Sequence, residues 1–351
     1  MGIKQKKKIQ YLSHGKEISG GYLHEKFLAE TLYHALGSDR YQYREKRHWK
    51  HFETKKAHLG LLRKAFVGGN ADITITVARL ALPVLLRNLF NRKKVIVVWH
   101  YYDAYDGKSK MLEKYYYAML AISNWIPKSK LAFVCVSPFW ERFFSKQFFL
   151  KPVFLFPNFL NPLAYTAVGK VAKKKQIHLG QVSFKNSNEV FLLAEQLHKK
   201  GYHCYFSTND PNKVFVHACY EVKYFAQTFD YLKEMAASEY TLAMPFIREG
   251  WNRVAHESLL VGTQVIGFDK GGLGDLLKGA NAFIVGEPEQ SETLTEYYRG
   301  IGKTATRNPI KETLDIILNQ KTQAINYTFL KQFETEQTGN YLLPILDWCR
   351  Q

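Results

Sequence analysis

The chain has 351 residues, with 49 Lys and Arg against 31 Asp and Glu, which gives a formal net charge of +18. A hydrophobic fraction of 46% excludes intrinsic disorder, which requires low hydrophobicity. The chain has no apolar run of about 18 residues, and its basic N-terminus lacks the apolar core of a signal peptide, so we expect neither a membrane span nor a secretory leader.

The first half alternates strand-like and helix-like segments. After a short apolar run at 8–12, residues 22–36 carry apolar side chains at helical spacing. Four apolar or β-branched runs then predict strands, with helical segments at 110–122 and 138–145 between them. These strands are expected at 72–77, 94–99, 131–136 and 153–156. Strands that alternate with helices predict βαβ units and a parallel sheet.

The pattern restarts after a loop-like stretch at 161–170. A helix is expected near 187–200, and further strands are expected at 176–179, 203–207, 240–244, 264–268 and 282–285. The predicted fold class is therefore α/β, with two Rossmann-like doubly wound domains. Their expected limits are 1–170 and 171–322, followed by C-terminal helices over 323–351 that cross back to the N-terminal domain. Sheets of this kind bind ligands beyond the carboxyl ends of their strands.

The segment 244–274 holds the densest set of candidate functional residues. A strand ends near residue 245, a loop carries Glu249 and Gly250, and a predicted helix from about 251 to 261 carries Glu257. Glycine beside a helix N-terminus exposes backbone N–H groups, which favour phosphate. Two carboxylates about two helical turns apart can accept hydrogen bonds from two separate sets of hydroxyls.

This segment resembles the nucleotide-sugar motif of retaining GT-B glycosyltransferases of the family-4 type. That motif is Glu-Gly-aromatic-Gly, a second Glu eight positions after the first, Gly-Thr-Pro-Val-Ile and Gly-Gly. This chain has Glu249-Gly250-Trp251-Asn252, Glu257, Gly262-Thr263-Gln264-Val265-Ile266 and Gly271-Gly272. It departs from the family at Asn252, which replaces a glycine, and at Gln264, which replaces a proline.

The resemblance extends to other parts of the chain. Gly20-Gly21 resembles the N-terminal glycine loop, His100 after a strand resembles the active-site histidine, and Gly180 followed by Lys185 resembles the phosphate-binding loop. Gln181 stands where the family has an arginine that pairs with this lysine, and the spacing to Lys185 is one residue short. Either Lys185 alone suffices, or Arg248, Arg253 or Lys270 supplies the missing cation, and the sequence leaves both alternatives open.

The resemblance implies a role for each matching residue. Glu257 binds the ribose hydroxyls of the donor, Glu249 binds donor-sugar hydroxyls, and Lys185 neutralises the leaving diphosphate. The Gly250-Trp251-Asn252 backbone contacts the sugar or the diphosphate. His100 hydrogen-bonds the transferred sugar, while Gly20 and Gly21 let their loop approach donor phosphate and acceptor. The catalytic candidates are thus His100, Lys185 and Glu249, and the donor-binding candidates are Gly20, Gly21, Gly250, Trp251, Asn252 and Glu257.

The function that this resemblance implies is transfer of a sugar, of hexosyltransferase type, from a UDP or GDP sugar to an acceptor hydroxyl. The two domains then face a cleft, the N-terminal one binding the acceptor and the other the donor. No cofactor or metal is expected, because GT-B enzymes generally need none; Asp103 and Asp106 are interpreted as cleft or acceptor residues. Four scattered cysteines predict neither a disulfide framework nor a zinc site, which fits a cytoplasmic protein.

Each candidate also has a purely structural interpretation. Glu257 could form an ordinary helix-surface ion pair, and Glu249 could complement a helix dipole. His100 could be a satisfied residue at a strand end, Lys185 could be a solvated loop lysine, and the glycines could serve turns alone. The order of the whole set favours the functional interpretation for most of them, while the alternatives for Lys185 stay evenly balanced.

The positive charge is confined to the first half. Residues 1–170 hold 29 basic and 11 acidic side chains, whereas the remainder holds 20 of each. Basic residues alternate with aromatics over 33–64 and 125–151, a pattern that suits an anionic membrane surface or a solvated face above core aromatics. The expected partners are a nucleotide sugar, a glycolipid or polysaccharide-precursor acceptor and the inner face of a membrane.

Two other functions remain open at this point. The first is another GT-B enzyme, such as a sugar phosphorylase or a nucleotide-sugar epimerase. The second is a basic, non-enzymatic nucleic-acid-binding protein, which rests on charge alone, since the chain contains no recognisable nucleic-acid motif.

Overall fold

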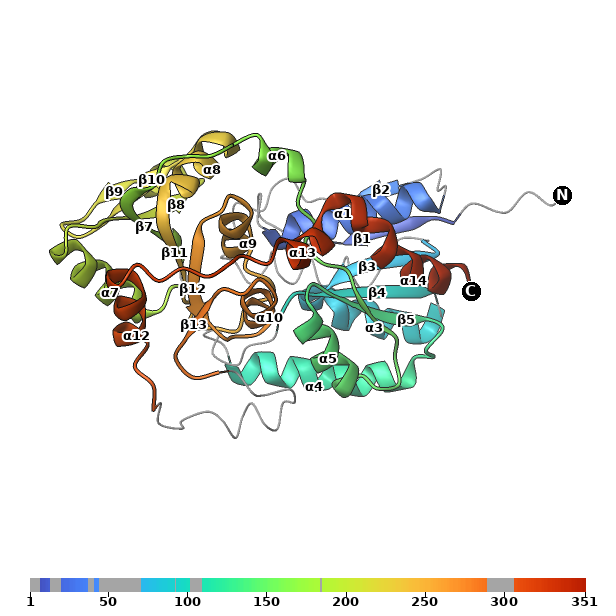
Figure 1. Ribbon diagram of the computed structural model, residues 1–351. Helices are drawn as coiled ribbons and strands as arrows, with labels where there is room; N and C mark the ends of the chain where they lie inside the picture. Colours follow the sequence, from blue (N-terminus) through green and yellow to red (C-terminus); the bar gives the residue numbers. More distant parts are fainter. Residues whose placement is uncertain are drawn as a thin grey trace. The chain divides into compact units, whose positions relative to one another are not determined.

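The computed structural model describes residues 7–12, 20–36, 41–43, 71–91, 93–101, 109–183, 185–288 and 306–351. The chain forms two compact units, one of Met1–Asn158 with Gln337–Gln351 and the other of Phe159–Glu336. We call these unit 1 and unit 2. Each is an α/β unit built on a parallel sheet (Figure 1). None of the described helices combines the length and the apolar character that a membrane crossing needs.

Unit 1 contains a six-stranded sheet in the order β2-β1-β3-β4-β5-β6, in which every pair is parallel. The strands are β1 (Ile9–Leu12), β2 (Tyr41–Tyr43), β3 (Ile73–Val77), β4 (Lys94–Trp99), β5 (Leu131–Cys135) and β6 (Val153–Leu155). The helices are α1 (Gly20–Ala35), α3 (Ala78–Asn91), α4 (Ser109–Trp125), α5 (Pro138–Gln147) and α14 (Thr338–Arg350).

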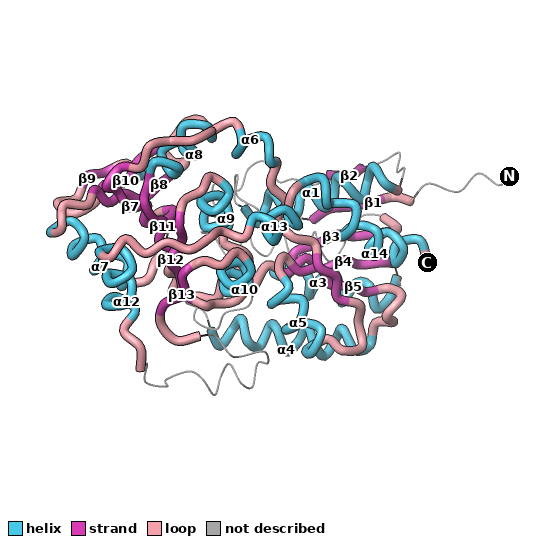
Figure 2. Tube along the Cα trace, in the orientation of Figure 1, coloured by secondary structure: helices cyan, strands magenta, loops and turns pink. Residues whose placement is uncertain are grey.

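Helices cover both faces of this sheet. The order β3-β4-β5-β6 advances in one direction, so right-handed crossovers place α3, α4 and α5 on one face, with α1 and α14 on the other (Figure 2). Strands β3, β4 and β5 are buried along their whole length, as expected for strands covered on both sides. The C-terminal helix α14 is fastened at its end by buried Lys94, whose Nζ donates to the carbonyl oxygen of Cys349 at 3.2 Å.

Unit 2 contains a seven-stranded sheet in the order β13-β12-β11-β7-β8-β10-β9, in which β9 runs antiparallel to β10. The strands are β7 (Lys174–Gln181), β8 (His203–Thr208), β9 (Phe215–Val216), β10 (Glu221–Tyr224), β11 (Ser238–Ala243), β12 (Gln264–Phe268) and β13 (Phe283–Val285). The helices are α6 (Pro162–Thr166), α7 (Asn188–Lys199), α8 (Thr228–Ala237), α9 (Arg253–Leu260), α10 (Gly272–Gly279), α12 (Pro309–Leu318) and α13 (Tyr327–Leu330).

The two faces of the unit 2 sheet differ in chemistry. Successive side chains of a strand point to opposite faces, and in β7 the apolar pair Ile177 and Leu179 joins the main hydrophobic core. The alternate residues Gln176 and His178 are buried too, but they lie in a polar layer. His178 contacts Ser207 Oγ through Nε2 at 3.1 Å, and burial lowers the pKa of His178 to about 3. This imidazole is therefore neutral at physiological pH.

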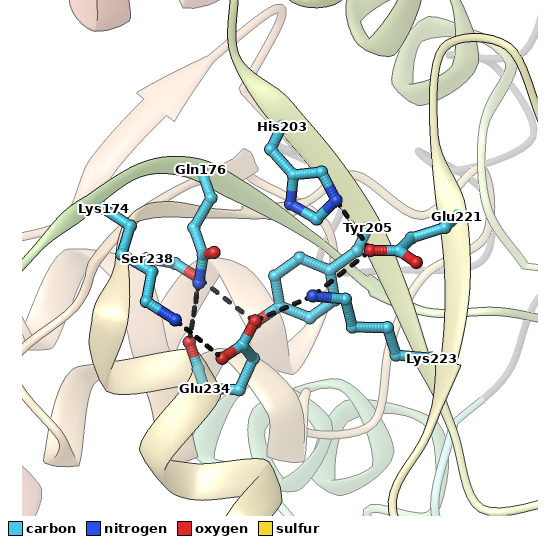
Figure 3. Close-up of polar contacts among 8 residues, drawn as sticks. All are labelled: Lys174, Gln176, His203, Tyr205, Glu221, Lys223, Glu234 and Ser238. Atoms are coloured by element: carbon cyan, nitrogen blue, oxygen red, sulfur yellow. Dashed lines mark hydrogen bonds and ion pairs between the residues drawn. The ribbon is translucent and has the colours of Figure 1, made fainter. Parts of the chain in front are cut away.

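The polar layer reaches the surface through a network of ion pairs (Figure 3). At its centre Glu234 of α8 accepts from Lys223 Nζ at 2.8 Å and from Lys174 Nζ at 3.5 Å. The network in Figure 3 comprises Lys174, Gln176, His203, Tyr205, Glu221, Lys223, Glu234 and Ser238. It joins the four neighbouring strands β11, β7, β8 and β10 to α8.

The structure confirms the predicted α/β class and most of the predicted strands, and it departs from the sequence prediction in local detail. Gly20 and Gly21 form the first turn of α1 instead of a loop before it. The expected loop at 161–170 contains the short helix α6, whose Tyr165 packs against Leu232. Because these residues pack on unit 2, the division between units falls after Asn158, upstream of residue 170.

Candidate functional site

Two loops of unit 2 meet at the motif predicted from sequence. Glu249, in the loop after β11, forms an isolated parallel bridge with Gly271, which follows β12. The N–H of Gly272 donates to the carbonyl oxygen of Glu249 at 2.9 Å. Gly271 has a φ of +61°, and a Cβ there would lie 2.5 Å from that carbonyl. Only glycine fits this approach, so the Gly-Gly pair fixes the position of Glu249.

The side chain of Glu249 contacts the second predicted residue, Lys185. Lys185 Nζ lies 3.4 Å from Glu249 Oε2, and the two side chains are 26% and 13% exposed. Backbone contacts hold the two loops together, since the carbonyl oxygen of Lys185 accepts from the N–H of Phe246 at 2.9 Å. The structure thus brings the candidate phosphate-neutralising cation to the candidate sugar-binding carboxylate.

Glu257 lies on α9 and is almost fully buried. Arg253 Nε donates to its Oε1 at 2.7 Å, and the phenols of Tyr165 and Tyr231 also donate to this carboxylate. Burial raises the pKa of Glu257 and outweighs the opposing effect of these three donors. The structural alternative considered from sequence placed Glu257 in a helix-surface ion pair. The ion pair is present, with Arg253 one helical turn away, but Glu257 is buried and not at the surface.

The residues between the two glutamates begin α9. Asn252 is the N-cap of this helix and accepts from the N–H of Ala255 at 2.9 Å. Asparagine is among the favoured N-cap residues, which explains why it can stand in place of the family's glycine. Trp251 is buried against Phe333, with ring centroids 4.6 Å apart. Gly250 is buried as well, and it lies two residues before the N-cap of α9.

The three candidates for the missing cation are engaged in different ways. Arg253 pairs with Glu257. Lys270 Nζ donates to the carbonyl oxygen of Phe246 at 3.0 Å. Arg248 is 2% exposed and forms part of the core beneath the loop. Lys185 lies against Glu249, and Gln181 is exposed at the end of β7.

The predicted histidine of unit 1 belongs to a three-residue polar chain. His100 follows β4, and its Nε2 lies 2.9 Å from Oε1 of the buried Glu25 on α1. The hydroxyl of Tyr11 donates to the other oxygen, Oε2, at 2.6 Å. An ionised carboxylate only accepts hydrogen bonds, so with Glu25 ionised the proton of this contact lies on Nε2 of His100.

Gly21 packs directly on this histidine. A Cβ at Gly21 would lie 3.4 Å from His100 Nε2, so a larger side chain would press on the imidazole. His24 lies on the same helix, with its ring centroid 5.2 Å from that of His100. Burial lowers the pKa of His24 to about 3, which leaves it neutral. The first turns of α1 thus surround His100.

Four residues of these clusters were not identified from sequence: Tyr11, Glu25, Tyr165 and Tyr231. Arg253 was identified only as a candidate cation, not as the partner of Glu257. The position of Glu25 within an apolar helical segment could have indicated a buried acid. Arg253 stands four residues before Glu257, and this spacing favours an ion pair on a helix. No sequence pattern connects the distant tyrosines with their carboxylates.

Some predicted residues lie outside the described part of the chain. Asp103 and Asp106 belong to this group, as does most of the basic segment 33–64. Within the described residues, no group of three His, Cys, Asp or Glu side chains is placed to hold a metal ion. All four cysteines are free.

The fold is that of the GT-B glycosyltransferases, in which one chain carries two Rossmann-like domains. The chain is similar to the crystal structure of Anabaena HepE in complex with UDP, with 14% identity, a TM-score of 0.58, and coverage of 97% of this chain and 99% of that one. HepE has also been crystallised with UDP and glucose.

Two further structures show the same likeness. Sucrose-phosphate synthase from Thermosynechococcus elongatus has a TM-score of 0.63 at 14% identity and covers 96% of this chain and 97% of its own. A glycosyltransferase from Rickettsia africae has a TM-score of 0.54 at 15% identity and covers 98% of both chains. No family model and no curated protein matches the sequence. At these identities the likeness establishes the fold.

Proposed function

We propose that the protein is a retaining glycosyltransferase of the family-4 type, which transfers a sugar from a UDP or GDP sugar to an acceptor hydroxyl. The observation that carries this proposal is that Glu249, Lys185 and Gly271 lie together at the carboxyl ends of parallel strands. Glu257 lies on α9, the helix that follows Glu249 in the chain. The complexes of HepE with UDP and with UDP-glucose support a uridine nucleotide as the first donor to test.

The donor is held through complementary charge and hydrogen bonding. Lys185 neutralises the diphosphate, whose charge grows as the glycosidic bond breaks, and the cation therefore stabilises the transition state more than the ground state. Lys185 Nζ lies 3.4 Å from Glu249 Oε2. When donor binds, Glu249 accepts from the sugar hydroxyls, and the backbone of Gly250, Trp251 and Asn252 contacts the sugar or the diphosphate.

Glu257 binds the ribose hydroxyls of the donor. An ionised carboxylate has about four acceptor positions, and Arg253, Tyr165 and Tyr231 use three of them. The ribose hydroxyls then donate to the same carboxylate, and the Arg253 side chain, which is 39% exposed, moves aside to admit them. The two tyrosines hold the carboxylate in place meanwhile.

His100 hydrogen-bonds the transferred sugar, with Gly20 and Gly21 allowing the start of α1 to approach donor phosphate and acceptor. No protein nucleophile is assigned, because in this reaction the leaving phosphate helps to deprotonate the acceptor on the same face of the sugar. No metal is included, in line with the family resemblance.

The acceptor in this proposal is a glycolipid or cell-surface polysaccharide precursor, bound by unit 1. The protein acts in the cytoplasm, at the inner face of the membrane, where the basic first half meets anionic lipids. The excess of positive charge within residues 1–170 supports this assignment.

Titration with UDP, GDP and ADP by calorimetry tests the donor site. Loss of hydrogen bonds to a charged group costs about 1.5–3 kcal/mol each, so Glu257→Ala should weaken binding of the preferred nucleotide about tenfold to a hundredfold. Glu195→Ala, which removes an exposed glutamate on α7, is the matched control and should bind as the wild type does. Equal affinities for wild type and Glu257→Ala would contradict the ribose role.

The reaction itself is tested by nuclear magnetic resonance of the product. A retaining transferase gives the donor's anomeric configuration in the product and releases the nucleoside diphosphate, also in the presence of EDTA. Release of a sugar phosphate would identify a phosphorylase, and an inverted anomer would exclude the retaining mechanism.

A further inference from the structure

One edge of unit 1 exposes large apolar side chains in a row. Phe90, near the end of α3, is 83% exposed; Trp125, the last residue of α4, is 81% exposed; and Phe149, just after α5, is 75% exposed. We call these three residues the aromatic row. Each lies at or just after the end of a helix, shortly before the next strand begins. Folding gives such side chains no benefit, since they remain in water.

The topology places the aromatic row on one surface. The three helices cover the same face of the sheet and end at the same edge, because the strands they feed are parallel. Neighbouring helices touch: the N–H of Leu82 on α3 donates to Tyr115 of α4, and Tyr116 of α4 packs on Phe148 after α5. Packed helices lie about 8–10 Å apart, so the row spans adjacent turns of one edge.

The same turns are positively charged. Residues 125–130 and 146–151 contain four lysines and no acidic residue. Lys128 and Lys146 are exposed, Lys130 and Lys151 are half-buried, and Leu150 adds exposed apolar area beside Phe149. Aromatic side chains at the headgroup level, surrounded by lysines, are the combination that binds anionic bilayers.

Not every aromatic residue of this segment belongs to the surface. Trp140, Phe143 and Phe144 are fully buried on the inner side of α5. The sequence pattern over 125–151 therefore contains two sets of aromatics. One set builds the core, and only the other reaches solvent.

We propose that the aromatic row and its lysines form the surface by which this protein docks on an anionic lipid bilayer. This inference deepens the proposed function, and one consequence rests on it. His100 lies at the opposite end of β4, a strand of six residues that spans about 20 Å. A bilayer against the aromatic row leaves the reacting acceptor hydroxyl at about that height. The acceptor is then the outer end of a lipid-linked saccharide of several sugars, not a lipid-proximal sugar.

Flotation with vesicles of phosphatidylcholine and phosphatidylglycerol tests the docking surface. The wild-type protein should float at low salt and less at high salt, whereas Trp125→Ser with Phe149→Ser should stay at the bottom. Lys128→Glu with Lys146→Glu should weaken binding at least about tenfold, given the contribution of each cation near an anionic surface. The control Phe215→Ser with Val216→Ser removes an exposed apolar pair from unit 2 and should float.

Tryptophan fluorescence gives an independent measurement. Trp125 is the exposed tryptophan among the described residues, so vesicle addition should shift the emission of wild type to the blue but not that of Trp125→Ser. Wild-type protein that does not bind anionic vesicles at low salt would overturn the proposal. Equal flotation of all variants would overturn it as well. A dimer that the Trp125 and Phe149 substitutions dissociate would assign the surface to a second copy and overturn it too.

These outcomes are separable from the proposed function. Nucleotide titration of the same variants should match wild type, because the aromatic row belongs to unit 1 and the motif belongs to unit 2. Failure of nucleotide binding by wild type would remove the transferase proposal and leave the flotation result standing.

Discussion

A buried carboxylate behind His100 is the residue-scale feature that most affects the proposed chemistry. Glu25 fixes the ring and the tautomer of His100 and is itself held by Tyr11. A hydrogen bond to a charged group contributes about 1.5–3 kcal/mol, which corresponds to about tenfold to a hundredfold in rate. Glu25→Leu should therefore lower kcat at least tenfold while KM for the donor changes little. Tyr11→Phe, which keeps the histidine contact, should lower it less.

The tautomer of His100 separates positioning from loss of structure. Nitrogen-15 resonances of the His100 ring should show the proton on Nε2 in wild type and a mixture of tautomers in Glu25→Leu. Wild-type ring signals in a variant with reduced kcat would argue against the positioning role.

Residues near one another in sequence were the predictable ones. Glu249, Glu257 and Gly271 belong to one strand-loop-helix-strand unit, whose spacing is set by backbone geometry. Lys185 could be identified only through the family resemblance. The contacts of Glu25 with His100 and of Tyr165 with Glu257 bridge distant parts of the chain, and such pairs depend on tertiary packing, which the pattern of one sequence does not encode.

At the scale of elements, the ion-pair network beneath α8 makes stability depend on pH. Burial alone would raise the pKa of Glu234 above its ordinary value of 4.5, but hydrogen bonds and charge from Lys223 and Lys174 lower it. A lowered folded-state pKa contributes stability above the unfolded-state pKa, and that stability is lost as pH falls through the folded-state value. The network thus stabilises the unit at neutral pH and fails in acid.

Glu234→Gln should accordingly reduce the free energy of unfolding by about 1 kcal/mol at neutral pH. The difference from wild type should shrink as the pH falls below 4.5. Urea unfolding at a series of pH values measures it, with Glu195→Gln as an exposed control. A difference that is the same at every pH would exclude the carboxylate's charge as the cause.

Buried elements were easier to predict than edge elements. Strands β4 and β12 coincide with their apolar runs, because strands buried on both faces must be apolar throughout. The edge strand β9 and its partner β10 were missed, since β9 has two exposed residues and β10 mixes charged with apolar ones. The short helix α6 was also missed, because five residues are too few for a helical period.

At the scale of the whole molecule, the positive charge and the glutamate motif lie mostly in different units. The unit that carries the glutamate motif comes mostly from the half of the sequence without net charge, and unit 1 comes mostly from the basic half. This division could be predicted from the sequence, because it depends on composition and on strand periodicity alone. Which basic segments face solvent could not, since core and surface aromatics alternate within the same stretch.

The C-terminal helix makes unit 1 discontinuous in sequence. A chain ending at residue 336 lacks α14 and leaves buried Lys94 without the carbonyl oxygens of Trp348 and Cys349. The truncated protein should show a lower melting temperature for unit 1, and hydrogen exchange should be faster in β4 and β6. Unit 2 ends at Glu336 and should keep its protection. Unchanged exchange in β4 would show that α14 is dispensable.

This arrangement also sets an order of events during biosynthesis. The strands of unit 1 are translated before unit 2, whereas its helix α14 is translated after unit 2. Unit 2 can therefore complete its fold while unit 1 still lacks a covering helix. A stop codon just before residue 338 therefore removes a helix from the unit whose strands were made earlier. Unit 1 can mature only after unit 2 has been translated.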